Sequence, residues 1–291
     1  MRWRRQRNRI TGFLVVLPSI LLVGIFVYGF ILFTVYLSFT DSRILPSFGW
    51  VGTKNYENLF KIRAWGIAVN NLVVFGALYI LICCALGLLL AILLDQKIRA
   101  EGFIRTIYLY PMALSFIVTG TAWKWILNPG LGLEYLMHRW GWEGFSFDWL
   151  VNPDRAIYCI VIAGVWQSAG FVMALFLAGL RGIDDSIIKA AQIDGASLPR
   201  IYWRIVLPSL RPVFFSTLMI VSHLAIKSFD LVMALTAGGP GFATDLPATF
   251  MYAMAFSRGQ IGVGAAAATV MLATIAAIVV PYLYSELRTR K

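Results

Sequence analysis

The chain has 291 residues, of which 59% are hydrophobic and only 13% are charged, with a formal net charge of +11 at pH 7 and a mean hydropathy of +0.76. Because a soluble domain carries about a quarter charged residues, this composition excludes an ordinary soluble protein and indicates an integral membrane protein. The positive charge is divided among separate segments between apolar runs, which argues against a nucleic-acid-binding surface and favours loops that face anionic lipid.

Six apolar stretches follow one another along the chain, at residues 10–39, 67–94, 103–127, 156–180, 212–237 and 261–284. Each is long enough to cross the hydrocarbon core of a bilayer, which is about 30 Å thick. Because backbone polar groups in lipid must be paired within their own segment, we expect six transmembrane helices and an all-α integral membrane protein. Pro281 lies near the end of the last stretch, where a membrane helix accommodates it.

The distribution of basic residues predicts the orientation of these helices. Residues 1–9 form a basic N-terminus before an apolar run that is too long for a signal peptide and lacks a cleavage site, so we predict an uncleaved signal anchor. If this end is cytoplasmic, the inner segments hold 16 of the 25 Lys and Arg residues, and these segments are 1–9, 95–105, 181–211 and 285–291. This bias places both termini in the cytoplasm.

The remaining outer segments contain features of a membrane interface rather than of a soluble domain. Residues 128–155 are rich in Trp and Gly, and residues 250–256 form an apolar run too short to span. We expect short interfacial helices there, with an irregular, turn-rich stretch at 238–249. The three cysteines, Cys83, Cys84 and Cys159, lie in apolar stretches and are predicted to be packing residues without a disulfide.

A polar segment, residues 185–208, separates the fourth and fifth stretches. Ile187, Ile188, Ala191 and Ile193 are predicted to form one apolar side of a short helix that Gly195 ends. A second short helix is expected at residues 198–206, with Pro208 closing it. Two short helices at a bend form a projection that another protein can bind, although an amphipathic helix lying on the membrane surface is the alternative.

This segment resembles the cytoplasmic coupling loop of ABC importer permeases. The matching positions are Lys189-Ala190-Ala191, Gly195, Ile205 and Leu207-Pro208, and Lys189 replaces the acidic residue that is usual in the family. The resemblance implies that the loop docks on a separate ATPase subunit. The residues it assigns to this contact are Ile187, Ile188, Lys189, Ala190, Ala191, Asp194, Gly195, Leu207 and Pro208.

The resemblance extends over nearly the whole chain. A signature of carbohydrate permeases is matched at residues 237–241 and 253–256. Five further segments are similar to permeases of proteobacterial glucose ABC importers, at residues 102–114, 122–133, 171–182, 208–216 and 226–232. The resemblance implies a type I ABC importer permease of the bacterial inner membrane with glucose as the leading substrate. It divides the chain into a basic N-terminus (1–9), a first helix and outer loop (10–66), a permease core (67–287) and a cytoplasmic tail (288–291).

The partners implied by the resemblance are a paralogous permease in a heterodimer, two copies of an ABC ATPase, a periplasmic sugar-binding protein and the sugar itself. The chain has no phosphate-binding loop, so ATP and magnesium are expected in the partner ATPase and this chain is predicted to be a transport subunit rather than an enzyme. Its two histidines are far apart and support no metal site.

Polar and aromatic residues within the spans are candidates for the substrate pathway, because sugars are bound by hydrogen bonds and aromatic stacking. The fourth stretch offers Trp166, Gln167, Ser168 and Phe171, and the fifth offers Ser222, His223, Lys227 and Ser228. Each has a structural alternative: a Gln satisfied by a neighbouring helix, a core Trp or His, and a Lys227 that extends to the interface and pairs with Asp230. The identity of the sugar, and the subunit that contacts it, stay open.

Two other functions are less compatible with the sequence. An ion-coupled secondary transporter needs an acidic residue deep in a span, whereas Asp41, Asp95 and Asp230 lie near the ends of the stretches. A membrane-embedded enzyme needs a reactive group of residues at membrane depth, and the sequence contains no such pattern.

Overall fold

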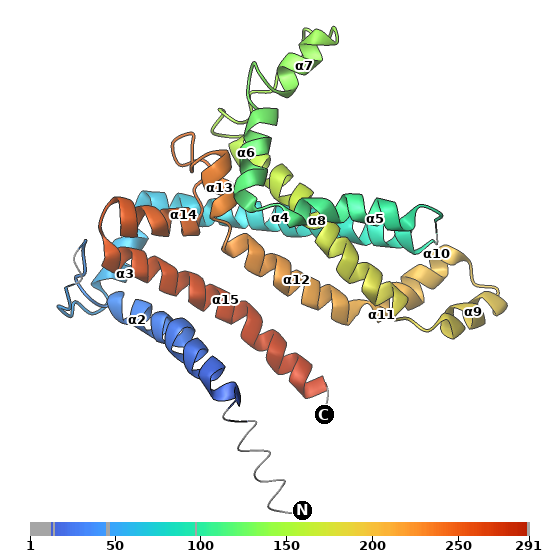
Figure 1. The fold of residues 1–291 in the computed structure, drawn as a ribbon, viewed down its shortest axis with the longest axis horizontal. Coiled ribbons are helices and arrows are strands. Elements are labelled where there is room, and N and C mark those ends of the chain that lie inside the picture. Colours follow the sequence, from blue (N-terminus) through green and yellow to red (C-terminus); the bar gives the residue numbers. More distant parts are fainter. Residues whose placement is uncertain (1–12, 14, 45–46, 97, 290–291) are drawn as a thin grey trace, which may run out of the picture. The chain divides into compact units, whose positions relative to one another are not determined.

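The computed structural model describes residue 13 and residues 15–44, 47–96 and 98–289 (Figure 1). The basic N-terminus predicted at residues 1–9 and the last two residues of the predicted tail lie outside the described residues. The described part of the chain is helical, apart from loops and an isolated bridge between Thr40 and Trp50. It divides into two units, residues 1–62 with 251–273 and residues 63–250 with 274–291.

The first unit contains the first span and the beginning of the last. The first span runs from Val15 to Leu37 and includes the π-helical turn η1 (Gly24–Gly29) and α2 (Phe30–Leu37). The amphipathic helix α3 (Lys54–Lys61) follows, and its buried Asn55 donates hydrogen bonds from Nδ2 to the carbonyls of Ser38 (2.9 Å) and Thr40 (2.7 Å). These bonds fix α3 to the end of the first span.

The start of the last span and the residues just before it complete this unit. The short elements α14 (Pro247–Tyr252) and η4 (Ala253–Ser257) lead into α15 (Ile261–Thr289), in which Pro281 lies within the helix as predicted. The expected short helix at residues 250–256 is therefore confirmed. Gly262 allows α15 to approach the end of α2 closely, because a Cβ there would lie 2.6 Å from the Thr40 carbonyl oxygen.

The second unit is built on the long helices α4 (Arg63–Asp95) and α8 (Ala156–Arg181), which pack against each other and confirm the second and fourth predicted spans (Figure 1). Most of the α8 surface is buried in this unit. A Cβ on Gly87 of α4 would lie 2.8 Å from Cβ of Val172 on α8, so the two backbones approach closely. The three cysteines are free and buried in this core, as predicted.

The third span is broken, which corrects the predicted continuous helix at 103–127. It consists of α5 (Glu101–Leu109), the 3-10 turn η2 (Tyr110–Ala113) and α6 (Phe116–Ile126), with a bend of 100° between the two parts. Pro111 removes a backbone donor, and the Ser115 side chain caps α6 by accepting a hydrogen bond from the Val118 N–H (3.3 Å). A new helix therefore starts at Ser115 in a new direction.

The fifth span is shorter than predicted. In place of one helix at 212–237, α12 (Arg211–Ile226) ends at Ile226 and the separate helix α13 (Asp230–Leu235) packs against α6. The Ser228 hydroxyl donates to the Leu224 carbonyl (2.9 Å), a local bond that competes with helix continuation. Including both bent pairs, the described residues contain up to six candidate spans.

The outer segment predicted to be interfacial holds the short helix α7 (Leu133–Arg139) and the exposed Trp140 and Trp142.

Candidate functional site: the coupling loop and the transport pathway

The loop between the fourth and fifth spans starts with a well-capped helix, α9 (Asp185–Ile193). Asp184 is the N-cap, and its Oδ1 accepts a hydrogen bond from the Ser186 backbone N–H (2.8 Å). Hydrogen bonds from the backbone and side chain of Ser186 hold the pKa of the Asp184 carboxyl below its ordinary value, and Lys189 adds to this effect. A charged carboxylate is therefore present at the positive end of the helix dipole.

The end of α9 is set by Gly195, as the sequence predicts. Gly195 has a φ of +77°, in the left-handed region that L-residues with a side chain adopt only with strain. The Gly195 N–H donates to the Gln192 carbonyl (3.0 Å), and the Ala196 N–H donates to the Ala191 carbonyl (3.0 Å). This pair of hydrogen bonds is the Schellman motif, which satisfies the last carbonyls of the helix and turns the chain sharply.

The second helix of the loop is longer than predicted. It passes from α10 (Leu198–Ile201) through the π-helical η3 (Tyr202–Val206) to α11 (Leu207–Ser209), so the prediction that Pro208 closes it is wrong. In η3 the Leu207 N–H donates to the Tyr202 carbonyl, five residues back. The missing N–H of Pro208 is tolerated because Pro208 lies in the first turn of α11, after this change in bonding pattern. The chain then bends by 62° into α12.

The apolar residues of α9 divide between two surfaces, which corrects the predicted single apolar side. Ile188 and Ala191 pack against the core of the second unit, whereas Ile187 and Ile193 are 49% and 86% exposed. The reason is geometric, since side chains turn by about 100° per residue in an α-helix and Ile193 follows Ala191 by two residues. Behind the loop, Ile188 and Tyr202 line a pocket of about 150 Å³ together with Gln96, the residue that follows α4.

Large apolar side chains are exposed on the outside of the loop. Leu198 and Trp203 are 56% and 74% exposed and add to Ile187 and Ile193. The other coupling residues predicted from sequence, Lys189, Ala190 and Asp194, are exposed in the same loop, while Leu207 and Pro208 are half-buried. A group of exposed apolar residues among polar ones is the usual composition of a protein-binding surface.

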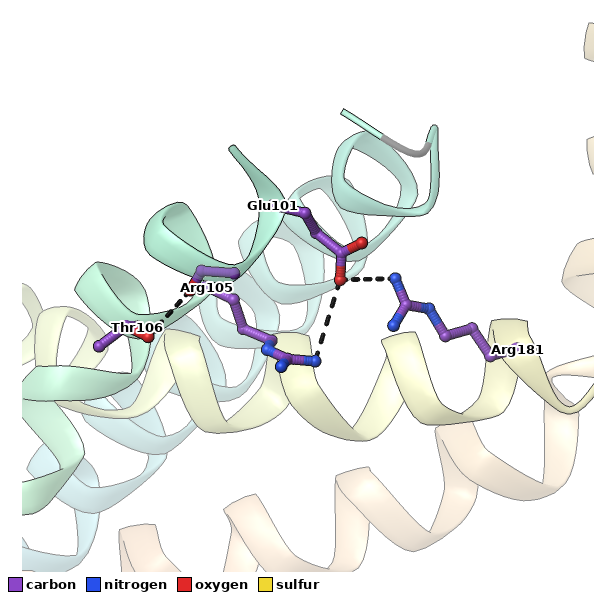
Figure 2. Close-up of polar contacts among 5 residues, drawn as sticks. Glu101, Arg105, Thr106 and Arg181 are labelled. Atoms are coloured by element: carbon purple, nitrogen blue, oxygen red, sulfur yellow. Dashed lines mark hydrogen bonds and ion pairs between the residues drawn. The ribbon is translucent and has the colours of Figure 1, made fainter. Parts of the chain in front are cut away.

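Polar contacts tie the loop and its flanking spans together on the side predicted to be cytoplasmic. Figure 2 shows the guanidinium groups of Arg181, in the last turn of α8, and Arg105 directed at one carboxylate oxygen of Glu101 in the first turn of α5. The N–O distances to Glu101 Oε1 are 2.6 Å for Arg181 and 3.9 Å for Arg105. On the other side of the loop, Gln96 Nε2 donates to the Tyr202 hydroxyl (2.9 Å). Sequence reasoning missed these contacts.

The fourth-span candidates occupy different environments. Gln167 is 3% exposed, and its Nε2 donates to the Leu114 carbonyl (2.8 Å) at the bend of the third span, while its Oε1 lacks a hydrogen-bond partner among the described residues. Ser168 is buried and accepts a hydrogen bond from the Tyr79 hydroxyl of α4 (2.7 Å). Trp166 is 41% exposed and meets Trp123 edge-on, and Phe171 is half-buried against the core. Gln167 and Ser168 therefore each bond to a neighbouring helix or bend, and Trp166 has the largest exposed surface of the four.

The fifth-span candidates lie toward the end of α12. His223 and Lys227 are exposed, Ser222 is half-buried, and Ser228 bonds to the helix backbone. None of the ion pairs within the described part of the chain includes Lys227, so the predicted Lys227–Asp230 pair is not formed. The helix ends at Ile226, and the three-residue spacing therefore no longer places both side chains on one helical face.

Comparisons with known proteins agree with this arrangement. The family model described as binding-protein-dependent transport system inner membrane component matches residues 85–290. A probable ABC transporter permease protein of Pyrococcus horikoshii is 39% identical over 273 residues, which are 93% of this chain and 94% of the relative. The xylose/arabinose import permease protein XacH of Haloferax volcanii is 37% identical over 269 residues, which are 91% of this chain and 84% of the relative.

A solved structure shares the whole fold. It is the crystal structure of a bacterial alginate ABC transporter in complex with an alginate pentasaccharide-bound periplasmic protein, and it matches with a TM-score of 0.84 at 20% identity over 99% of this chain and 98% of that chain. The predicted type I ABC importer permease fold is thereby confirmed. The relatives are permease subunits rather than enzymes, which confirms the predicted transport role. The chain is a multi-pass membrane protein that belongs to the inner-membrane components of binding-protein-dependent transport systems, the permease subunits of ABC transporters.

Proposed function

We propose that this chain forms half of the translocation pathway of an ATP-driven sugar importer and transmits the motion of a separate ATPase through residues 185–208. The observation that carries the proposal is the coupling loop itself. Its first helix has a fixed start at Asp184 and a fixed end at Gly195, and four apolar side chains, Ile187, Ile193, Leu198 and Trp203, are exposed on its outside. A rigid projection with an apolar surface is suited to docking in a groove of another subunit.

The proposed partners are a paralogous permease, two copies of an ABC ATPase and a periplasmic sugar-binding protein. The family description, which names a binding protein, and the periplasmic protein bound in the alginate transporter support the last of these. ATP and magnesium would bind in the ATPase subunits, and both termini of this chain would lie in the cytoplasm. The charge bias of the loops supports that orientation.

A carbohydrate is the proposed substrate class, because XacH is named for xylose and arabinose and the alginate transporter for an acidic polysaccharide. Within this class we propose glucose or a related sugar, on the support of sequence segments alone, at residues 102–114, 122–133, 171–182, 208–216 and 226–232. Trp166 of α8 is the favoured stacking residue, since it combines an aromatic ring with a 41% exposed surface. His223 and Lys227 of α12 are the next candidates because both are exposed.

In the proposed mechanism, ATP binding closes the two ATPase subunits and moves the coupling loops of both permeases together. The loop passes directly into α8 through Arg181 and into α12 through the bend at Leu210, so these two helices follow its displacement. Their movement would open the pathway to the binding protein, and hydrolysis would reverse it.

The test compares exposed tryptophans on the two predicted sides of the membrane. In the reconstituted complex, Trp203→Ser and Ile193→Ser should weaken association with the ATPase and reduce uptake. Trp140→Ser is the matched control, since Trp140 is 69% exposed in the predicted outer segment. Equal ATPase binding by Trp203→Ser, Ile193→Ser and the wild type would refute docking at this loop. Uptake of labelled glucose, xylose, arabinose and alginate oligosaccharide then decides the substrate separately.

A further inference from the structure

A pocket of about 800 Å³ lies in the first unit, where the predicted outer ends of the first and last spans meet. It is lined by the segment after α2, by the first turns of α3 and by the residues at the start of α15. Pockets that bind small molecules have volumes of about 300–1,000 Å³, so this one is large enough for a ligand. None of its lining residues belongs to the coupling loop or to the candidate transport residues.

The lining of this pocket is strongly basic. Arg43, Lys54 and Arg258 come from its three walls, and no carboxylate lies within 4.0 Å of any of them among the described residues. The one acid of the lining, Asp41, accepts a hydrogen bond from the Ser47 hydroxyl (2.7 Å). Three cations against one acid therefore leave an excess of positive charge.

The clustering of these cations is informative because the predicted outer segments contain only nine Lys and Arg residues in total. A third of them thus face one pocket. Asn58 and Gln260 also line it and carry amide groups that donate hydrogen bonds without adding charge. This donor set suits an anion with neutral polar groups beside it, such as a phosphate ester with hydroxyls.

Aromatic residues place the pocket at the level of the membrane interface. In the same unit, Trp50 stacks on Phe39 with ring centroids 5.3 Å apart and also approaches Tyr36. Trp50 and Phe48 are nevertheless 66% and 59% exposed. Exposed Trp and Tyr side chains at the end of a span are typical of the headgroup region, where the phosphates of lipids lie.

From these observations we propose that the pocket binds the phosphate headgroup of an anionic phospholipid, with Arg43, Lys54 and Arg258 as the charged contacts. Most apolar side chains of the first span are exposed within this structure and none in its most apolar stretch is buried, which provides a surface for acyl chains. Arg and Lys side chains bind phosphate groups through charge-assisted hydrogen bonds. The lipid would hold the outer ends of the first and last spans together.

The experiment uses the assembled transporter in nanodiscs of phosphatidylcholine with or without phosphatidylglycerol. Lipids retained after purification are quantified by mass spectrometry for the wild type and for the triple variant Arg43→Gln, Lys54→Gln, Arg258→Gln. The matched control is Lys61→Gln, Lys124→Gln, Arg139→Gln, which removes three other exposed cations of the predicted outer segments. The wild type and the control should retain phosphatidylglycerol over phosphatidylcholine, and the triple variant should lose this enrichment several-fold.

Additional variants and ligands separate the remaining explanations. Arg43→Lys with Arg258→Lys keeps the charge and should retain the lipid, so a folding defect of the triple variant does not leave the proposal undecided. If inorganic phosphate or glycerol phosphate at matched concentration displaces the lipid, the same cationic contacts bind a free phosphate. The proposal is overturned if the control loses as much lipid as the triple variant. It is also overturned if the triple variant keeps the lipid but loses response to the solute-binding protein, which would make the pocket a protein-docking site.

Discussion

Arg181 Nη2 lies 2.6 Å from Glu101 Oε1, and this contact joins the last turn of the fourth span to the first turn of the third span immediately before the coupling loop (Figure 2). Both side chains are partly exposed, with 42% and 23% of their surfaces accessible. Ion pairs in such positions contribute about 0.2–1 kcal/mol to stability, because water screens them. The position of the pair at the loop suggests that its importance is in transmitting motion rather than in folding.

We therefore predict that Glu101→Gln and Arg181→Gln reduce the coupling of ATP hydrolysis to uptake while changing the thermal midpoint of the complex little. Arg105→Gln is the control, because its nitrogen lies 3.9 Å from Glu101 and its loss should have a weaker effect. The measurement is transported sugar per ATP hydrolysed. In a double-mutant cycle, additive effects of the two substitutions would show that the pair does not act as a unit.

Replacing Gly195 by Val should uncouple transport without preventing membrane insertion. A β-branched residue at a φ of +77° is strained by an amount on the order of 1–3 kcal/mol, and this strain acts on the Schellman turn. Gly130→Val is a matched control, since Gly130 also has a positive φ and open space around it but lies in a different loop. Uptake and ATPase association are measured for both. Wild-type values for Gly195→Val would remove the turn from the coupling mechanism.

Lys189→Glu should be tolerated, because it restores the acid that is usual in the related permeases and Lys189 is exposed without an ion pair among the described residues. We expect the ATPase complex to survive with at most a small change in affinity, as for other exposed charges. Affinity is measured by titrating purified ATPase subunits against the permease pair. Complete loss of the complex would show instead that Lys189 contacts an acidic groove.

In the fourth span, Trp166→Ala should reduce uptake more than Lys227→Ala does, because an exposed ring provides stacking and shape to a sugar. Gln167→Ala should act differently. It leaves the part-buried Leu114 carbonyl at the bend without its donor, and this should cost less than the ~1–3 kcal/mol of a fully buried unpaired group. We expect a lower thermal midpoint for this variant and an unchanged order of sugar preference. Normal transport by Trp166→Ala together with an altered sugar profile for Lys227→Ala would move recognition to the fifth span.

The parts of the fold that depend on local sequence could be predicted. The long helices α4, α8 and α15 follow from uninterrupted apolar length, and the stop at Gly195 follows from the backbone freedom of glycine. The bend of the third span had a local signal, Pro111 followed by the helix-capping Ser115, but it is also held by a hydrogen bond from Gln167 to the Leu114 carbonyl, 53 residues away in the chain. Contacts of that kind are set by tertiary packing.

In the candidate site, too, some features follow from local sequence and others from tertiary packing. The boundaries of α9 are local and were predictable, whereas the burial of Ile188 and the exposure of Ile187 depend on where the core of the second unit lies. The Glu101–Arg181 contact joins residues 80 positions apart, and no spacing rule connects them. The end of α12 at Ile226 lies inside the apolar stretch 212–237, so apolar length does not reveal it.

The close approach of α4 and α8 has a mechanical consequence. Gly87 leaves no room for a methyl group beside Val172, and Gly170 of α8 is even closer to the Tyr108 carbonyl of the third span. Helices interlocked at this separation cannot slide along one another, because interiors packed this tightly transmit strain instead of absorbing it. A force applied near Arg181 would therefore displace α4, α8 and the start of the third span as one rigid body. Bending would then be confined to the helix breaks at Leu114 and Lys227.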